Sequence, residues 1–132
     1  MKKTRLEMRG IILIKIDIPK SSLSIPVSGI HKVNSDSGVY FMRDSSGRIV
    51  YIGEALYLRK RLTEHMAGKS GTTKRFCHVF HSIDVFYCDR KDRKIYEIYA
   101  INLYNPIGNV EGNESASKVE LKKRREDWIR SL

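Results

Sequence analysis

Four short stretches of this 132-residue chain are apolar or rich in β-branched and aromatic residues, the composition that favours β-strands. They cover residues 11–19, 38–43, 48–53 and 83–88. The second and third stretches flank the turn sequence Asp-Ser-Ser-Gly, so they predict a β-hairpin. Residues 20–36 contain Ser, Pro, Gly and Asn and are expected to form a loop.

A helical period replaces the strand pattern elsewhere in the chain. Leu58, Leu62 and Met66 recur every four residues and predict a first helix that begins after residue 55. Residues 89–104 begin with polar residues and continue as an amphipathic helix that stops before a proline. A last helix is predicted at about residues 116–129.

The charge of the chain narrows the range of functions. Lys and Arg total 25 against 15 acidic residues, which gives a formal net charge of +10. Much of the excess lies between residues 55 and 80, and a second basic run begins at Lys118. Such a surface attracts polyanions, and nucleic acid is the commonest polyanion of the cytoplasm. The alternative is a solvated basic face without a partner.

Neither a membrane span nor a disulfide framework is indicated. No apolar run approaches the roughly 20 residues that cross a bilayer. Lys15 and Asp17 interrupt the apolar residues near the N-terminus, which favours a strand over a signal peptide. Cys77 and Cys88 are the two cysteines, too few for a disulfide scaffold. We therefore expect a protein of the reducing cytoplasm with no membrane partner.

The predicted hairpin brings two tyrosines together. If residues 44–47 form the loop, Tyr40 lies opposite Tyr51 and Gly38 lies opposite Gly53, with each pair on one sheet face. Those glycines would let another group approach the backbone. The opposite face is expected to be the core side, and it holds Val39, Phe41, Val50 and Ile52. The alternative is an aromatic pair that only stabilises the hairpin.

Further polar side chains are predicted near the tyrosines. Arg61 and His65 are four residues apart and therefore share one face of the first helix. Glu97 lies in an apolar stretch of the second helix, where a carboxylate needs a cation or a metal as partner. An ion pair with Arg93 or Lys94 at the helix edge is the alternative.

Two other motifs carry weaker signals. Cys77, His78, His81 and Cys88 do not have the spacing of a usual zinc site. The segment Gly-Lys-Ser-Gly-Thr-Thr-Lys at residues 68–74 lacks the spacing of a P-loop, and we expect it to be a flexible loop that contacts the DNA backbone.

The motifs together resemble those of the GIY-YIG nuclease family, most closely the standalone relatives of the UvrC N-terminal nuclease domain. The resemblance covers about residues 35–110 and is carried by Gly38-Val39-Tyr40, Tyr51-Ile52-Gly53, Arg61, His65, Glu97 and Asn109. One position departs from the UvrC pattern, because Glu54 stands where a lysine is usual.

The resemblance implies a small α/β (α+β) fold, with a three-stranded antiparallel sheet flanked by helices. It divides the single domain into an N-terminal strand and loop at residues 1–34, a nuclease core at 35–110 and a basic C-terminal helix at 111–132. It further implies a metal-dependent endonuclease that hydrolyses DNA phosphodiester bonds in repair, recombination or defence. The alternative is a binding module derived from such a nuclease that has lost activity.

The resemblance also assigns roles to the site residues. Glu97 would hold Mg²⁺ or Mn²⁺, and Arg61 would stabilise charge on the phosphate. One of the two tyrosines would act as the general base or relay. We favour Tyr40 for this role over Tyr51, which would then orient the water or phosphate, and His65 would relay a proton or contact phosphate.

The remaining predictions concern Asn109 and the substrate. Asn109 corresponds to the asparagine of the family's catalytic set. DNA contacts are predicted at Gly53, Arg59, Lys60, Lys69, Lys74 and Arg75. A separate targeting protein or homodimerisation is expected to direct the chain to its DNA.

Overall fold

The computed structural model describes the backbone of residues 2–8 and 11–132, and the side chains of residues 16–132. The strands are β1 (Lys2–Met8), β2 (Ile11–Ile18), β3 (Leu23–Pro26), β4 (Gly38–Arg43), β5 (Ile49–Ala55) and β6 (Ser82–Tyr87). The α-helices are α1 (Leu58–Met66), α2 (Arg93–Tyr104) and α3 (Lys118–Ser131). Two short 3₁₀ helices, η1 (Val27–Lys32) and η2 (Cys77–Val79), complete the elements.

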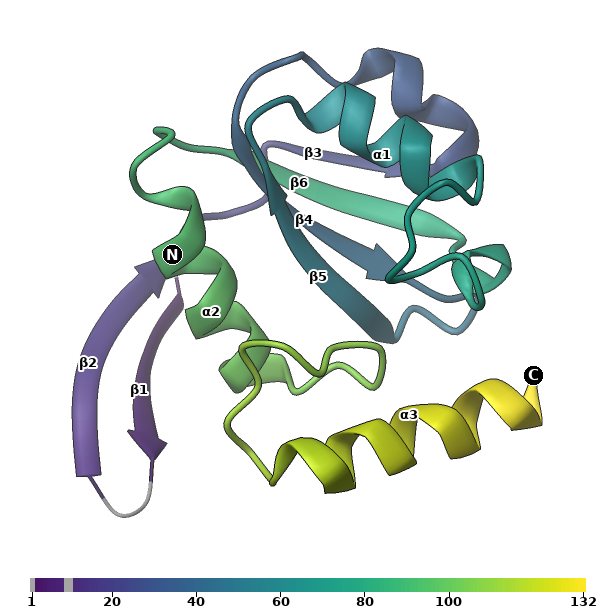
Figure 1. Cartoon of the computed structure of the whole chain (residues 1–132). Coiled ribbons are helices and arrows are strands. Elements are labelled where there is room, and N and C mark those ends of the chain that lie inside the picture. Colours follow the sequence, from purple (N-terminus) through teal and green to yellow (C-terminus); the bar gives the residue numbers. More distant parts are fainter. Residues whose placement is uncertain (1, 9–10) are drawn as a thin grey trace.

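The main sheet is antiparallel and has the strand order β3-β6-β4-β5, while β1 and β2 form a separate hairpin (Figure 1). The α/β class and the flanking helices are confirmed, but the sheet has four strands where three were predicted. The added strand β3 lies in the segment that was expected to be a loop. It pairs with β6 through only four residues and ends at Pro26, so it was too short to show a clear period.

The β4–β5 hairpin has a different register from the predicted one. Tyr40 lies opposite Gly53, and Tyr51 lies opposite Met42. Two one-residue differences cause this: Arg43 pairs with Ile49 rather than with Arg48, and a bulge then separates that pair from the Met42 pair. Together the two differences shift the pairing by two residues. Side chains alternate between the two faces along a strand, so the tyrosines still project from the same sheet face.

Both faces of the sheet are buried, whereas only one was predicted to be. The face without the tyrosines packs Val39, Phe41 and Ile52 against α2. The face with the tyrosines packs against α1, through Leu58 and Leu62. Val50 was predicted on the first face but lies in the second cluster, because the bulge turns it to the tyrosine side.

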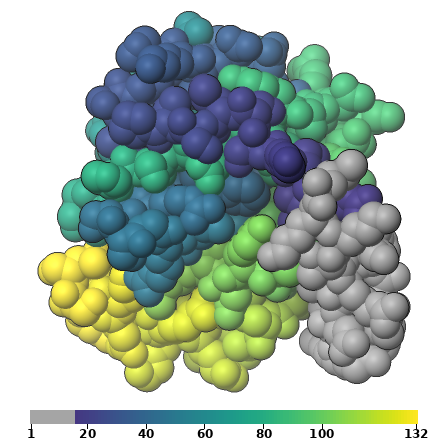
Figure 2. All heavy atoms as spheres, turned by 180° about the vertical axis from the view of Figure 1, so that it is seen from behind, coloured from purple at the N-terminus to yellow at the C-terminus, as the bar shows by residue number. Residues whose placement is uncertain are grey.

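The C-terminal helix α3 (yellow) and the segment before it form one end of the molecule (Figures 1 and 2). Its Trp128 ring packs on Phe76, with 5.1 Å between ring centroids, and its Leu121 is buried. A Ser117 cap begins the helix by accepting a hydrogen bond from the Glu120 N–H. None of the helices in the described part of the chain has the length and apolarity that a bilayer crossing requires.

Candidate active site

Tyr40 lies at the centre of the candidate site, on the central strand β4. A methyl group at Gly53 would lie 2.2 Å from the Tyr40 Oη atom and 2.3 Å from its Cζ atom, so only glycine leaves room for this ring. The group that approaches the Gly53 backbone is therefore Tyr40 itself. Because Gly53 is buried beneath the ring, the predicted direct DNA contact at Gly53 does not fit the structure.

A buried hydrogen-bonded chain runs from Tyr40 through His65 to Thr73. The Tyr40 hydroxyl lies 2.6 Å from His65 Nε2, and Thr73 Oγ1 lies 2.5 Å from His65 Nδ1. His65 is 0% exposed, and desolvation followed by the charge of Arg61 lowers its pKa to about 4. The imidazole is therefore neutral at pH 7. Both ring nitrogens have buried partners, so a direct phosphate contact does not fit, whereas the predicted proton relay agrees with these bonds.

Tyr51 lies beside Tyr40 but is less enclosed. Their ring centroids are 6.4 Å apart, and Tyr51 is partly exposed while Tyr40 is 1% exposed. Burial raises the pKa of both hydroxyls. The positive charge of Arg61 opposes this effect on both of them. Both tyrosines are therefore neutral at pH 7, next to a cation that favours their deprotonation.

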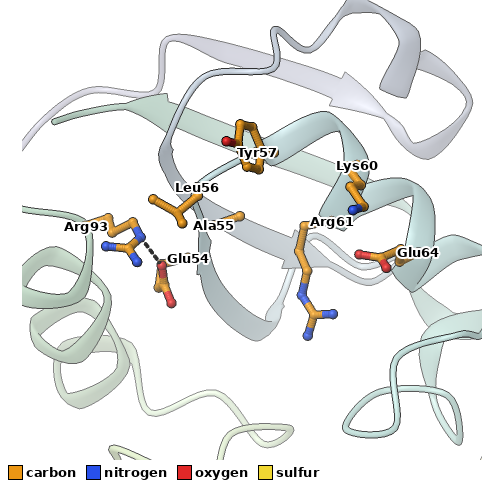
Figure 3. A pocket seen from close by; sticks show the side chains of 8 residues that line it. All are labelled: Glu54, Ala55, Leu56, Tyr57, Lys60, Arg61, Glu64 and Arg93. Atoms are coloured by element: carbon orange, nitrogen blue, oxygen red, sulfur yellow. Dashed lines mark ion pairs between the residues drawn. The ribbon is translucent and has the colours of Figure 1, made fainter. Parts of the chain in front are cut away.

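Arg61 extends from α1 into a hollow of about 300 Å³, with Lys60 beside it and Glu54 and Arg93 opposite (Figure 3). The Arg61 Nη2 atom donates a hydrogen bond to Ser70 Oγ at 3.2 Å. This bond uses one of the five donors of the guanidinium. The others can bind the oxygens of an incoming phosphate.

Glu97 projects from α2 toward the same site and is partly buried. It lines a hollow together with Tyr51, and its charge acts on both tyrosines. Desolvation and then the nearby Glu54 carboxylate raise the pKa of Glu97 to about 7. The surroundings are less apolar than predicted, because Ile95 and Ile98 on the same helix are exposed.

The alternative partners predicted for Glu97 pair with Glu54 instead. The Arg93 Nε atom lies 2.6 Å from the Glu54 carboxylate (Figure 3). The Lys94 Nζ atom lies 3.4 Å from the same carboxylate. The unusual acid at position 54 is thus matched by two cations from the start of α2. The Glu54 carboxylate is therefore held by ion pairs to α2 and is not an unpaired negative charge facing a bound phosphate.

A divalent cation fits Glu97. The carboxylate is partly desolvated, lies near a second carboxylate and forms no ion pair within the described residues. A bound cation would relieve the repulsion that raises its pKa, and Mg²⁺ prefers such oxygen ligands together with several waters. The described part of the chain contains no cluster of three or more His, Cys, Asp or Glu side chains suited to a metal. The site would thus hold a cation through one protein carboxylate and solvent.

Asn109 clamps the loop after α2 to strand β5. Its Oδ1 atom accepts from the Ile52 N–H at 2.9 Å, and its Nδ2 atom donates to the Ile52 carbonyl at 2.8 Å. The residue is buried, and both ends of its amide are engaged by the backbone beside Tyr51. Its place next to the site agrees with the predicted set, but its contacts are those of a positioning residue.

The basic residues predicted to contact DNA are divided among several positions. Lys69 and Lys74 are exposed in the loop after α1, and Lys60 lies next to Arg61. Arg59 donates a hydrogen bond to the Val33 carbonyl at 2.6 Å, and part of it is exposed. Arg75 differs most from the predicted DNA contact, because it forms a bidentate ion pair with α3.

That ion pair joins Arg75 to Glu126 at 2.6 and 2.8 Å. A phosphate contact at Arg75 would have to compete with it. Sequence reasoning also missed Thr73 and Ser70, which bond to His65 and Arg61. It missed Arg125 as well, whose charge lowers the pKa of Tyr51. Only the basic run of the last helix hinted at Arg125.

Comparison with known sequences matches the part of the chain that contains these site residues. The sequence model of the GIY-YIG catalytic domain matches residues 36–111. UvrABC system protein C of Cronobacter sakazakii is 35% identical over 86 residues, which are 63% of this chain and 14% of that protein. The protein of the same name from Chlamydia trachomatis is 44% identical over 43 residues, 33% of this chain and 7% of the relative. The chain thus spans a small part of these relatives.

Solved structures show the same fold. The GIY-YIG N-terminal endonuclease domain of UvrC from Thermotoga maritima, bound to magnesium as its catalytic divalent cation, has a TM-score of 0.56 and 24% identity. The alignment covers 63% of this chain and 93% of that domain. A point mutant of the same domain has a TM-score of 0.57 and 22% identity, with 64% and 93% covered.

Proposed function

The chain belongs to the GIY-YIG family, and on that premise we propose that it is a metal-dependent endonuclease that hydrolyses phosphodiester bonds in DNA. One observation carries the proposal: Tyr40, Tyr51, Arg61 and Glu97 come from four different elements and meet at a single site. The two tyrosine rings lie side by side, Tyr51 and Glu97 line one hollow, and the charges of Arg61 and Glu97 act on both tyrosines. A hairpin that only needed an aromatic pair would not also require an arginine and a partly buried carboxylate beside it.

The attacking water would lose its proton to the Tyr40–His65 pair. As the Tyr40 oxygen takes a proton from water, the hydroxyl proton of Tyr40 can move to His65 Nε2, 2.6 Å away. Tyr40 then stays neutral, which agrees with the burial that raises its pKa. The imidazole becomes the cation, and the Nδ1–H can be donated to Thr73 Oγ1. Tyr51 would orient the water or the phosphate.

Arg61 would bind the phosphate oxygens as negative charge builds on them. The new bond joins the water oxygen to phosphorus, and the bond to one ester oxygen of the DNA strand breaks. Glu97 would hold Mg²⁺ or Mn²⁺, which when bound supplies positive charge at the phosphate and the leaving oxygen. Asn109 would keep strand β5, and with it Tyr51, in register with this set.

The basic surface would hold the DNA backbone. Lys60, Lys69 and Lys74 are exposed and can neutralise phosphates outside the site. We further propose that the protein acts in the cytoplasm in repair, recombination or defence of DNA, and that a targeting protein or a second copy directs it. The division of the chain at residues 34 and 110 belongs to the same proposal, although β3 ties residues 23–26 to the main sheet.

Nicking of supercoiled plasmid tests the proposal. The wild-type protein should nick it with Mg²⁺, and a parallel reaction with Mn²⁺ examines the second metal. EDTA should abolish the reaction, and so should Glu97→Gln. That variant should melt no lower than the wild type, because the substitution removes a carboxylate whose ionised form is disfavoured by burial. An inactive binding module would instead bind DNA and leave the plasmid supercoiled with either metal.

A further inference from the structure

The C-terminal helix α3 lies beyond the matched family segment, which ends at residue 111, yet several contacts hold it beside the site. Its Arg124 guanidinium donates to the Asn105 side chain at 3.0 Å and to the Pro106 carbonyl at 3.3 Å. Together with the Arg75–Glu126 pair and the ring packing of Trp128, these contacts fix the helix at both its middle and its end.

Arg125 of this helix lines two hollows. The first is about 230 Å³ in volume and is lined also by Tyr51 and Glu97, so it opens onto the candidate active site. The second is about 290 Å³. Both hollows are bordered by Thr72, Glu111 and Arg125. Because they share these residues, the two hollows adjoin at Arg125, one beside the site and the other along α3.

The charge of Arg125 is available to a ligand. Within the described part of the chain, Arg125 forms no hydrogen bond and no ion pair, in contrast to Arg124 and Arg130. Two acids near it are already matched, because Glu126 pairs with Arg75 and Glu111 pairs with Lys118 at 2.6 Å. Glu97 lines the first hollow together with Arg125, but the two side chains form no ion pair. The charge of Arg125 also offsets part of the rise that burial causes in the pKa of Tyr51, so it reaches the site.

We propose that Arg125 is a DNA-contact residue that binds a phosphate next to the scissile one, so that α3 completes the substrate groove. The inference rests on the nuclease function proposed above. Arg61 borders a different hollow from Arg125, and the charges of both guanidinium groups act on Tyr51. A planar guanidinium with its donors free is well suited to a phosphate diester.

The test is DNA binding measured by fluorescence anisotropy over a salt series, in the Glu97→Gln background so that no DNA is cut. Adding Arg125→Gln should weaken binding about tenfold at moderate salt, as expected for a lost charge-assisted contact. It should also reduce the salt slope by about 0.9, the value for one phosphate. Arg125→Lys keeps the charge and should recover most of the affinity.

Arg130→Gln is the matched control. It makes the same substitution in the same helix, but the Arg130 guanidinium pairs with Asp127 on the surface and lines neither hollow. The proposal is overturned if Arg125→Gln and Arg130→Gln have equal affinities and slopes. It is also overturned if Arg125→Gln lowers the melting temperature and Arg125→Lys fails to restore binding, since the residue would then be structural.

Failure of the proposed nuclease function would look different. A protein with Glu97 intact would then leave plasmid uncut with Mg²⁺ and with Mn²⁺. The anisotropy series does not depend on cleavage, so it would still decide whether Arg125 contacts DNA.

Discussion

Mild acid should destabilise the Glu97→Gln variant through protonation of His65. In the wild type, protonation of Glu97 opposes this effect. The lowered pKa of about 4 means that the folded protein keeps the His65 ring neutral, whereas the unfolded chain takes up a proton below its ordinary pKa of 6.5. The unfolded state therefore binds more protons between these two values. The stability that His65 contributes is complete above pH 6.5 and is lost as the pH falls toward 4.

The two pKa values of His65 give a loss of about 2 kcal/mol in the free energy of unfolding from about pH 7 to about pH 5. Glu97 acts in the opposite direction, because its pKa is raised from 4.5 to about 7 in the folded state. Its protonation stabilises the folded, metal-free protein over the same interval. The wild type should therefore lose less stability than Glu97→Gln on acidification, and the variant should reveal the loss that is due to His65.

Urea unfolding followed by circular dichroism measures this difference in EDTA at about pH 7 and about pH 5. Glu97→Gln should lose about 2 kcal/mol on acidification, and the double variant Glu97→Gln/His65→Gln should lose little. The NMR titration of the His65 ring in Glu97→Gln gives a second reading that needs no further substitution. Equal stability of Glu97→Gln at both pH values, or a ring that titrates near 6.5, would refute the buried neutral imidazole and the proton path from Tyr40.

Three substitutions test other parts of the site, each by urea unfolding together with plasmid nicking. Tyr40→Phe should lower the free energy of unfolding by about 1–3 kcal/mol because it removes the buried partner of an imidazole nitrogen, and Tyr51→Phe should lower it less. Both variants should nick more slowly. Equal losses of stability would contradict the buried hydrogen bond. Gly53→Ala should cost about 1–3 kcal/mol and abolish nicking by displacing the Tyr40 ring, while Gly71→Ala, with open space around its Cβ, should behave as wild type. Asn109→Ala should cost about 2 kcal/mol or more through two lost backbone bonds, and a neutral result would show that the clamp is unnecessary.

The sequence was most informative where one element carries the whole signal. The tyrosines share a sheet face although the predicted register was wrong, because strand side chains alternate and a shift of two residues restores the face. Arg61 and His65 share a face of α1 because a helix repeats about every four residues. The bulge at Val50 was not predicted, because neither β propensity nor periodicity marks where an extra residue enters a strand.

Contacts between distant segments were beyond such reasoning. Nothing local to Arg75 or Glu126 indicates that they pair across 51 positions, and nothing local to Glu54 indicates that Arg93 will match it. These pairs depend on how α2 and α3 lie against the sheet, which is decided by packing over the whole chain. The same reason explains why Arg125 was read only as one charge of a basic run.

Burial of the tyrosine face has a chemical consequence that the solvent-exposed face predicted from the hairpin would not have. On an exposed face, Tyr40 would lose its proton to solvent and would act as a phenolate. Enclosed as it is, the phenolate is disfavoured, but a neutral imidazole lies 2.6 Å from the hydroxyl. Burial thus favours transfer of a proton through Tyr40 over storage of charge on it, and it requires that His65 be neutral beforehand. The low pKa of His65 meets that requirement, which is why the stability of the fold and the proposed chemistry depend on the same ring.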